Sequence, residues 1–141
     1  MKSLIRLRDF VVATTRIVER SPNDEPEQLA GTALLLRDLV NHDDWLPDEY
    51  ATPDPKFYRQ CLLHADPLGR FSVISFVWGP GQRTPIHDHR TWGLVGILRG
   101  GEISTSYERL PGGGRDGAPR SGPRRRGFAV DRRRPPDRQR L

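Results

Sequence analysis

Apolar residues recur every three or four positions over residues 4–20 and again over residues 25–40. This spacing places them on one face of an α-helix. In the first segment the stripe consists of Leu4, Leu7, Val11, Val12, Thr15, Ile17 and Val18. Ser21 and Pro22 end it, because proline disfavours helical geometry in the residue before it. In the second segment, where Pro26 suits a first helical turn, the stripe consists of Leu29, Ala33, Leu36, Leu39 and Val40. The sequence therefore predicts two N-terminal helices that pack on a core.

The middle of the chain alternates short β-branched or aromatic runs with turn residues. Runs of strand length and composition cover residues 57–64, 71–78, 92–98 and 102–107. Asp66 to Gly69 predicts a hairpin turn between the first two runs. Gly79 to Gly81 predicts a second turn, after which His87 would open a new strand. The expected fold class is mainly β.

The composition changes after residue 110. Of residues 111–141, 21 are Arg, Gly or Pro, and the sizeable apolar residues are Phe128, Val130 and Leu141. Such a composition buries too little apolar surface to offset the chain entropy lost on folding. We therefore expect a disordered tail without strands.

Three interpretations of this tail stay open. The first is an arginine-rich arm for nucleic acid, since the triplets at 124–126 and 132–134 attract phosphate, although no interleaved aromatic residues offer base stacking. The second is a solvated linker. The third, which we favour, is a reading frame lost near Gly112, because a one-base shift in a GC-rich gene yields Arg, Gly and Pro codons. On that interpretation nucleic acid is not an expected partner.

Length and charge narrow the class of protein. A chain of 141 residues is long enough for one domain with a sizeable core. Its formal net charge of +5 comes from the tail, because residues 1–110 hold 13 Lys and Arg against 15 Asp and Glu, whereas residues 111–141 hold 10 Arg against 3 Asp.

The single cysteine, Cys61, excludes an internal disulfide and fits a reducing compartment. No apolar run is long enough for a secretory signal or a membrane span, so we expect a cytoplasmic monomer without membrane contact.

The strongest chemical signal is the pair His87 and His89, which follows Gly81 and precedes Gly100. Strand side chains alternate between faces, so two histidines separated by one residue point to the same side and can bind one metal ion. His42 lies in a polar turn and His64 at a strand end, so neither is expected to be a ligand. The sequence therefore predicts a metal site on the pair.

The spacing Gly81, His87, His89, position 93 and Gly100 resembles the first sequence motif of the cupin superfamily. Position 93 is Gly, where a typical cupin has a metal-binding Glu. This loss resembles the cysteine dioxygenase family, whose iron is held by three histidines and no acid. Residues 70–100 are similar to the bacterial branch of that family, which includes cysteine and 3-mercaptopropionate dioxygenases. The resemblance covers about residues 25–110.

The resemblance implies a cupin-type double-stranded β-helix, a jelly-roll barrel with N-terminal helices, incomplete after about residue 110. Its parts would be an N-terminal helical segment over 1–50, the N-terminal part of the barrel over 51–110, and the tail over 111–141. The implied activity is Fe(II)-dependent oxidation of a small thiol carboxylate to its sulfinate, with O₂ as cosubstrate. A neutral set of histidines leaves positions on Fe(II) where thiolate and O₂ bind side by side.

The resemblance also implies site residues. His87 and His89 would bind Fe(II), and Tyr58 and Gln60, on one face of a strand, would line the substrate end. Gln60 stands where the animal enzymes have an arginine, and it cannot form the bidentate charged pair that guanidinium makes with a carboxylate. The bacterial 3-mercaptopropionate dioxygenases are similar in carrying Gln there, and cysteine and 3-mercaptopropionate both stay open as the substrate. The third metal ligand and the family's Ser-His-Tyr relay would come from the region after residue 110, yet the chain has no histidine after His89.

Three hypotheses of function follow. The first is a thiol dioxygenase of the cysteine dioxygenase family, truncated or frameshifted, whose own activity is in doubt. The second is a non-enzymatic cupin remnant that binds metal. The third is a protein that associates with nucleic acid through its arginine-rich tail.

Overall fold

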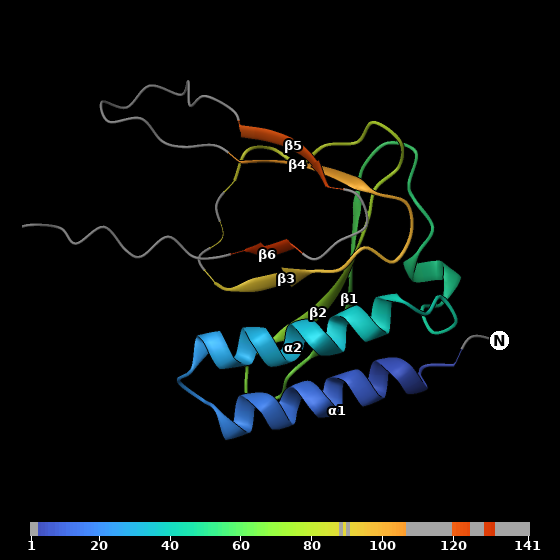
Figure 1. Ribbon diagram of the computed structural model, residues 1–141. Helices are drawn as coiled ribbons and strands as arrows, with labels where there is room; N and C mark the ends of the chain where they lie inside the picture. Colours follow the sequence, from blue (N-terminus) through green and yellow to red (C-terminus); the bar gives the residue numbers. More distant parts are fainter. Residues whose placement is uncertain (1–2, 88, 90, 107–119, 125–128, 132–141) are drawn as a thin grey trace, which may run out of the picture.

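The computed structural model packs two antiparallel helices against a β-hairpin, and two further strand pairs lie on the other side of α2 from α1 (Figure 1). It describes residues 3–87, 89, 91–106, 120–124 and 129–131. The elements in chain order are α1 (Ile5–Arg20), α2 (Glu25–Val40), the 3₁₀ turn η1 (Asp48–Tyr50), β1 (Arg59–Ala65), β2 (Ser72–Val77), β3 (Gly93–Val95), β4 (Glu102–Ser106), β5 (Arg120–Arg124) and β6 (Ala129–Asp131).

Helix α1 confirms the first predicted helix but buries a different stripe. Its buried residues are Leu7, Phe10, Thr14, Ile17 and Val18. Leu4 and Val12, which the pattern placed on the buried face, are 53% and 43% exposed. The buried positions follow the three-and-four spacing without a break. The predicted stripe shares Leu7, Ile17 and Val18 with this face, but it has Val11 and Thr15 where the structure buries Phe10 and Thr14.

Helix α2 begins and ends where the sequence predicts, at Glu25 and Val40. Its start is set locally, since the Asp24 side chain accepts the backbone N–H of Glu27 at 3.0 Å and Pro26 occupies the first turn. The most buried residues are Gln28, Thr32 and Leu39, so the contact face is shifted by one position from the predicted stripe. The Gln28 amide nitrogen is satisfied by the Ser21 carbonyl at 2.6 Å.

The two helices approach closely at Gly31. A Cβ atom placed there would lie 2.9 Å from Cδ1 of Ile17, a separation that real side chains avoid. Glycine at this position therefore permits the contact between α1 and α2.

The hydrophobic core joins the helices to the hairpin. Its buried cluster consists of Leu7, Phe10, Leu39, Trp45 and Leu46. Leu63 of β1, Val73 of β2 and Leu98, which follows β3, pack against this cluster. The Trp45 indole N–H donates to the Leu39 carbonyl at 3.0 Å, which satisfies its one polar atom inside the core.

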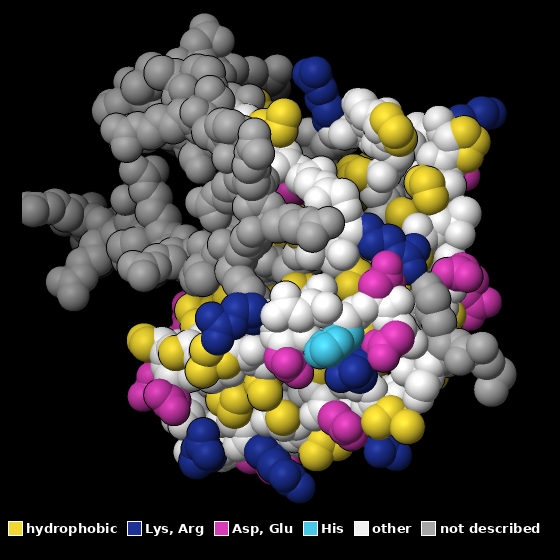
Figure 2. All heavy atoms as spheres, turned by 45° about the vertical axis from the view of Figure 1, so that its right-hand side comes forward, with side chains coloured by type: hydrophobic (Ala, Val, Ile, Leu, Met, Phe, Trp, Pro, Cys, Tyr) yellow, Lys and Arg dark blue, Asp and Glu magenta, His cyan; other side chains and the backbone are white. Residues whose placement is uncertain are grey.

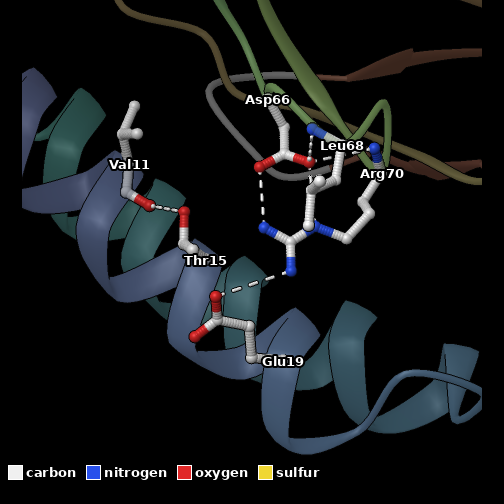
Figure 3. A network of polar contacts seen from close by, with 6 residues as sticks. All are labelled: Val11, Thr15, Glu19, Asp66, Leu68 and Arg70. Carbon is white, nitrogen blue, oxygen red and sulfur yellow. Dashed lines mark hydrogen bonds and ion pairs between the residues drawn. The ribbon is translucent and has the colours of Figure 1, made fainter.

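The predicted hairpin over residues 57–78 is confirmed as the antiparallel pair β1–β2. Its turn uses Gly69 at φ +69°, a conformation that favours glycine. The Asp66 carboxylate accepts the backbone N–H groups of Leu68 and Arg70, each at 3.1 Å, and pairs with the Arg70 guanidinium. That guanidinium lies 3.6 Å from the carboxylate of Glu19 on α1, so the turn is tied to the helix (Figure 3).

The region after β2 differs from the sequence expectation. Strand β3 is shorter than the predicted run over 92–98, and the chain around His87 adopts no strand. Strands β5 and β6 lie in the segment expected to be without strands, where β5 pairs with β4 and β6 pairs with β3. Backbone pairing with a free strand edge needs little apolar surface, and Pro123 is tolerated because β5 is itself an edge strand. The remainder of residues 111–141 lies outside the described residues.

Across the described ranges, the strands form three separate two-stranded sheets rather than a closed barrel. Strand β3 is held to α2 just past its end, where a Cβ on Gly96 would lie 2.8 Å from Cγ1 of Val40. No helix in the described part of the chain is long and apolar enough to cross a membrane.

Candidate metal-binding site

His87 and His89 lie together in the connection between β2 and β3. Their imidazole rings stack with centroids 4.8 Å apart and planes 27° apart, and both residues are exposed. The two imidazoles are therefore neighbours, and whether they bind one metal ion stays a prediction. Asp88, between them, lies outside the described residues.

The orientation of His87 is set by its own backbone. Its Nδ1 lies 2.7 Å from the carbonyl oxygen of Pro85. A carbonyl only accepts, so the neutral ring donates from Nδ1 and its Nε2 lone pair is left for a metal ion. Histidine ligands commonly use this arrangement, in which one ring nitrogen is held by the protein and the other binds the metal.

The pair does not sit on a strand. The sequence predicted that His87 opens one, but the chain from Gln82 to Trp92 has no regular pairing among its described residues. Gly81, at φ +78°, turns the chain here, and Pro85 has no N–H to give to a ladder. The two rings are brought together by this local turn and not by strand alternation.

Gln60 lies in β1, whereas Tyr58 directly precedes that strand, so the two residues do not both belong to one strand as the sequence predicted. Tyr58 is half-buried and its ring stacks on Trp78 at 6.0 Å, while Gln60 is exposed and pairs across the hairpin with Phe76. Trp78 also stacks on Phe76 at 5.3 Å. The rings of Tyr58, Trp78 and Phe76 therefore form an aromatic row beside the Gln60 amide.

The same face of the hairpin continues as an apolar surface. Leu62 pairs across the hairpin with Ile74, and cross-strand partners point to the same side of a sheet. Leu62, Ile74 and Phe76 are 62%, 41% and 44% exposed. Leu63 and Val73 point the other way, toward the helices. An uncharged face with an amide and an aromatic row at one end resembles one wall of a ligand site.

His87 contacts His89, and Tyr58 contacts Trp78. His64 packs on Phe71 with ring centroids 5.6 Å apart, and the backbone N–H of His42 donates to the Leu39 carbonyl in the turn after α2. Within the described ranges, no group of three His, Cys, Asp or Glu side chains is placed to hold a metal ion. The histidine pair thus supplies two ligands.

Sequence reasoning missed Gln82. Its side chain joins the turn after β2 to the segment before β1, two regions with no shared sequence pattern. It lines an open depression of about 260 Å³ together with Pro53, Asp54, Pro55, Gly79 and Pro80. No local pattern in the sequence indicates this contact, because its partner Asp54 lies 28 positions away.

The third hypothesis rests on the arginine-rich tail, most of which lies outside the described residues, so the described surface leaves it untested. On the face of the molecule that Figure 2 shows, acidic and basic side chains are intermingled over the described surface and do not gather in a basic patch. Arg99, for example, is paired with Asp43 at 2.6 and 2.7 Å. Phosphate binding needs cations that are free to replace counterions.

The chain matches no family model.

Proposed function

We propose that this chain is an Fe(II)-dependent thiol dioxygenase of the cysteine dioxygenase type, in which His87 and His89 bind the metal. The substrate is a small thiol carboxylate, and O₂ is the cosubstrate. The observation that carries the proposal is the stacked imidazole pair, with His87 Nδ1 held by the Pro85 carbonyl and Nε2 left for a metal. Bound Fe(II) would supply adjacent positions for thiolate and O₂.

The aromatic row supports a role for the start of β1 in substrate binding. Tyr58 offers a hydroxyl and Gln60 an amide, and both can hydrogen-bond a carboxylate without carrying a charge. Neither provides the bidentate cation that would select a zwitterionic amino acid carboxylate. The proposed substrate is therefore 3-mercaptopropionate in preference to cysteine.

The donor set fits the metal only in part. Two imidazoles suit Fe(II), but among the described residues there is no third group beside them. We therefore propose that the chain as given binds iron weakly and that turnover needs a further histidine, which a shifted reading frame near Gly112 would remove.

An anaerobic Fe(II) titration followed by calorimetry tests the metal site. We expect weak binding of one iron per chain, lost in His87→Ala and in His89→Ala. His64→Ala serves as the matched control, since His64 packs on Phe71 away from the pair. Binding that persists in His87→Ala would refute the assignment, and tight one-to-one binding in the unaltered chain would reveal a third ligand.

A second candidate function is metal binding without catalysis. The observation that favours it is the absence of a third ligand within the part of the chain that the structure describes. An oxygen electrode separates the two candidates. Oxygen uptake with 3-mercaptopropionate or cysteine supports the dioxygenase, and iron binding without uptake supports the metal-binding module.

A further inference from the structure

The segment that leads to His87 is tied to the segment that leads to Tyr58 by the side chain of Gln82. Its Nε2 donates to the backbone carbonyl of Asp54 at 2.8 Å, and its Oε1 accepts the backbone N–H of Gly79 at 2.7 Å. The backbone N–H of Gln82 donates to the Gly79 carbonyl at 3.2 Å. Both ends of the amide are satisfied within the protein, so Gln82 acts as a tie and not as a ligand group.

The Asp54 end of this tie is held in place. The Asp54 carboxylate accepts the backbone N–H groups of Lys56 and Phe57 at 2.8 and 3.1 Å. These two hydrogen bonds lower the pKa of the carboxyl group, which therefore stays ionised and keeps accepting them at neutral pH. Tyr58 directly follows Phe57. The hydrogen bond from Gln82 to Asp54 therefore attaches Gln82 to the short segment that leads through Tyr58 into β1.

The chain between Gln82 and His87 has little freedom. Pro85 fixes its own φ, and it restricts Thr84 to extended conformations. The Pro85 carbonyl then holds the His87 ring at Nδ1. Only Arg83 and Ile86 in this stretch lack such a restriction. A constraint at Gln82 is therefore transmitted over a short, stiff segment to the imidazole.

We infer that Gln82 is a positioning residue for the histidine pair. It fixes the turn that carries His87 and His89 relative to Tyr58, which precedes β1, and Gln60, which lies in β1. The purpose of this ordering rests on the proposed metal site, but the ordering itself does not. Without the hydrogen bond from Gln82 to Asp54, the turn that carries the histidine pair would no longer be attached to the segment before β1. The histidine pair and Tyr58 would then move independently.

Backbone ¹⁵N relaxation on the metal-free protein tests the ordering. Gln82→Met removes both side-chain hydrogen bonds at similar volume, and Gln82→Glu keeps an acceptor for Gly79 but loses the donor to Asp54. In both variants we expect the order parameters of Thr84, Ile86 and His87 to fall, to below about 0.6 in the Met variant. The Glu variant keeps the test valid if Gln82→Met fails to fold.

The matched control is Ser75→Ala. The Ser75 hydroxyl donates to the Tyr50 carbonyl at 2.9 Å, which also joins β2 to the segment before β1, but away from the histidine turn. This variant should leave the three order parameters unchanged. Unchanged order parameters in both Gln82 variants, or an equal fall in Ser75→Ala, would overturn the role of Gln82.

A metal titration of the same variants separates this inference from the proposed function. If Gln82 orders the ligands, Gln82→Met should weaken Fe(II) binding on the order of tenfold, as loss of a residue that orients ligands does, and Ser75→Ala should not. If the unaltered chain binds no metal through His87 and His89, the proposed function fails, while the order parameters still decide the role of Gln82.

Discussion

The carboxylate of Asp66 and the guanidinium of Arg70 form a two-point ion pair, with Oδ1 2.8 Å from Nη2 and Oδ2 2.8 Å from Nε. The Asp66 side chain is only 2% exposed, whereas Arg70 is 25% exposed and reaches on toward Glu19. The pair closes the β1–β2 turn and attaches it to α1 (Figure 3). The side-chain hydrogen bonds from Arg70 are the main reason that the pKa of Asp66 lies well below its ordinary value of 3.8.

This ion pair predicts a pH dependence of stability. A carboxyl group with a lowered folded-state pKa stabilises the fold fully above the unfolded-state pKa of 3.8, and the contribution is lost as the pH falls below that value. Asp66→Asn should therefore lower the thermal midpoint at pH 7 by several degrees and flatten its fall below pH 3.8. Calorimetry across pH measures both effects. Glu19→Gln is the control and should change little, because Glu19 is 58% exposed and 3.6 Å from Arg70.

The contact between β3 and α2 predicts a specific sensitivity at Gly96. A Cβ atom there would lie 2.8 Å from Cγ1 of Val40 and 3.0 Å from Cγ of Leu36, so Gly96→Ala overpacks this contact. We expect a loss of about 1–3 kcal/mol in urea unfolding. Gly101→Ala is the matched control, because a Cβ there meets nothing within 4 Å, and its effect should stay within about 0.5 kcal/mol. Equal effects would show that β3 does not pack on α2.

Removing residues 111–141 should affect association more than stability. The core cluster and the side chains packed on it all lie between Leu7 and Leu98, so the thermal midpoint should be nearly unchanged. The deletion removes β5 and β6, and it leaves β4 and β3 with free edges that promote self-association. Calorimetry and light scattering measure the two effects.

A lysine on the free edge provides the control for this deletion. Ile103 on β4 is 78% exposed, and Ile103→Lys in the shortened chain should suppress the association, because a charge on an edge strand opposes pairing. Unfolding of the shortened chain would show instead that the β4–β5 and β3–β6 pairs are needed for the fold.

Catalysis should depend on the reading frame. The chain as given should consume no oxygen with cysteine or 3-mercaptopropionate, because two imidazoles leave the metal weakly held. If restoring one base near codon 112 encodes a downstream histidine, the restored protein should consume oxygen and favour 3-mercaptopropionate, since Gln60 supplies no cation. Turnover by the unrestored chain would refute the need for a further ligand, and a strict preference for cysteine would refute the argument from Gln60.

The sequence was sufficient to predict the helix and hairpin ends that are determined by residues close by in the chain. The cap at Asp24 and the proline at position 26 set the start of α2, and the turn from Asp66 to Gly69 sets the hairpin. The faces of the helices were less predictable. Polar residues such as Thr14 and Gln28 are buried there, because the packing partner and not polarity decides burial at a close helix contact.

The parts that could not be predicted depend on long-range partners. Whether residues 120–124 form a strand depends on the free edge of β4, and their own composition gives no sign of it. In the candidate site, the spacing of His87 and His89 led to the expectation of a strand, whereas the structure brings the two rings together in a turn. The tie from Gln82 to Asp54 joins residues 28 positions apart and has no local signature.

The confinement of the core to residues before β4 has a consequence for biosynthesis. Domains fold as units while the chain emerges from the ribosome, N-terminal parts first. Once Leu98 has emerged, every described side chain of the core cluster is present, whatever residues follow it. A change in the gene beyond the codon for Leu98 is therefore expected to leave this cluster unaltered in the protein that is made.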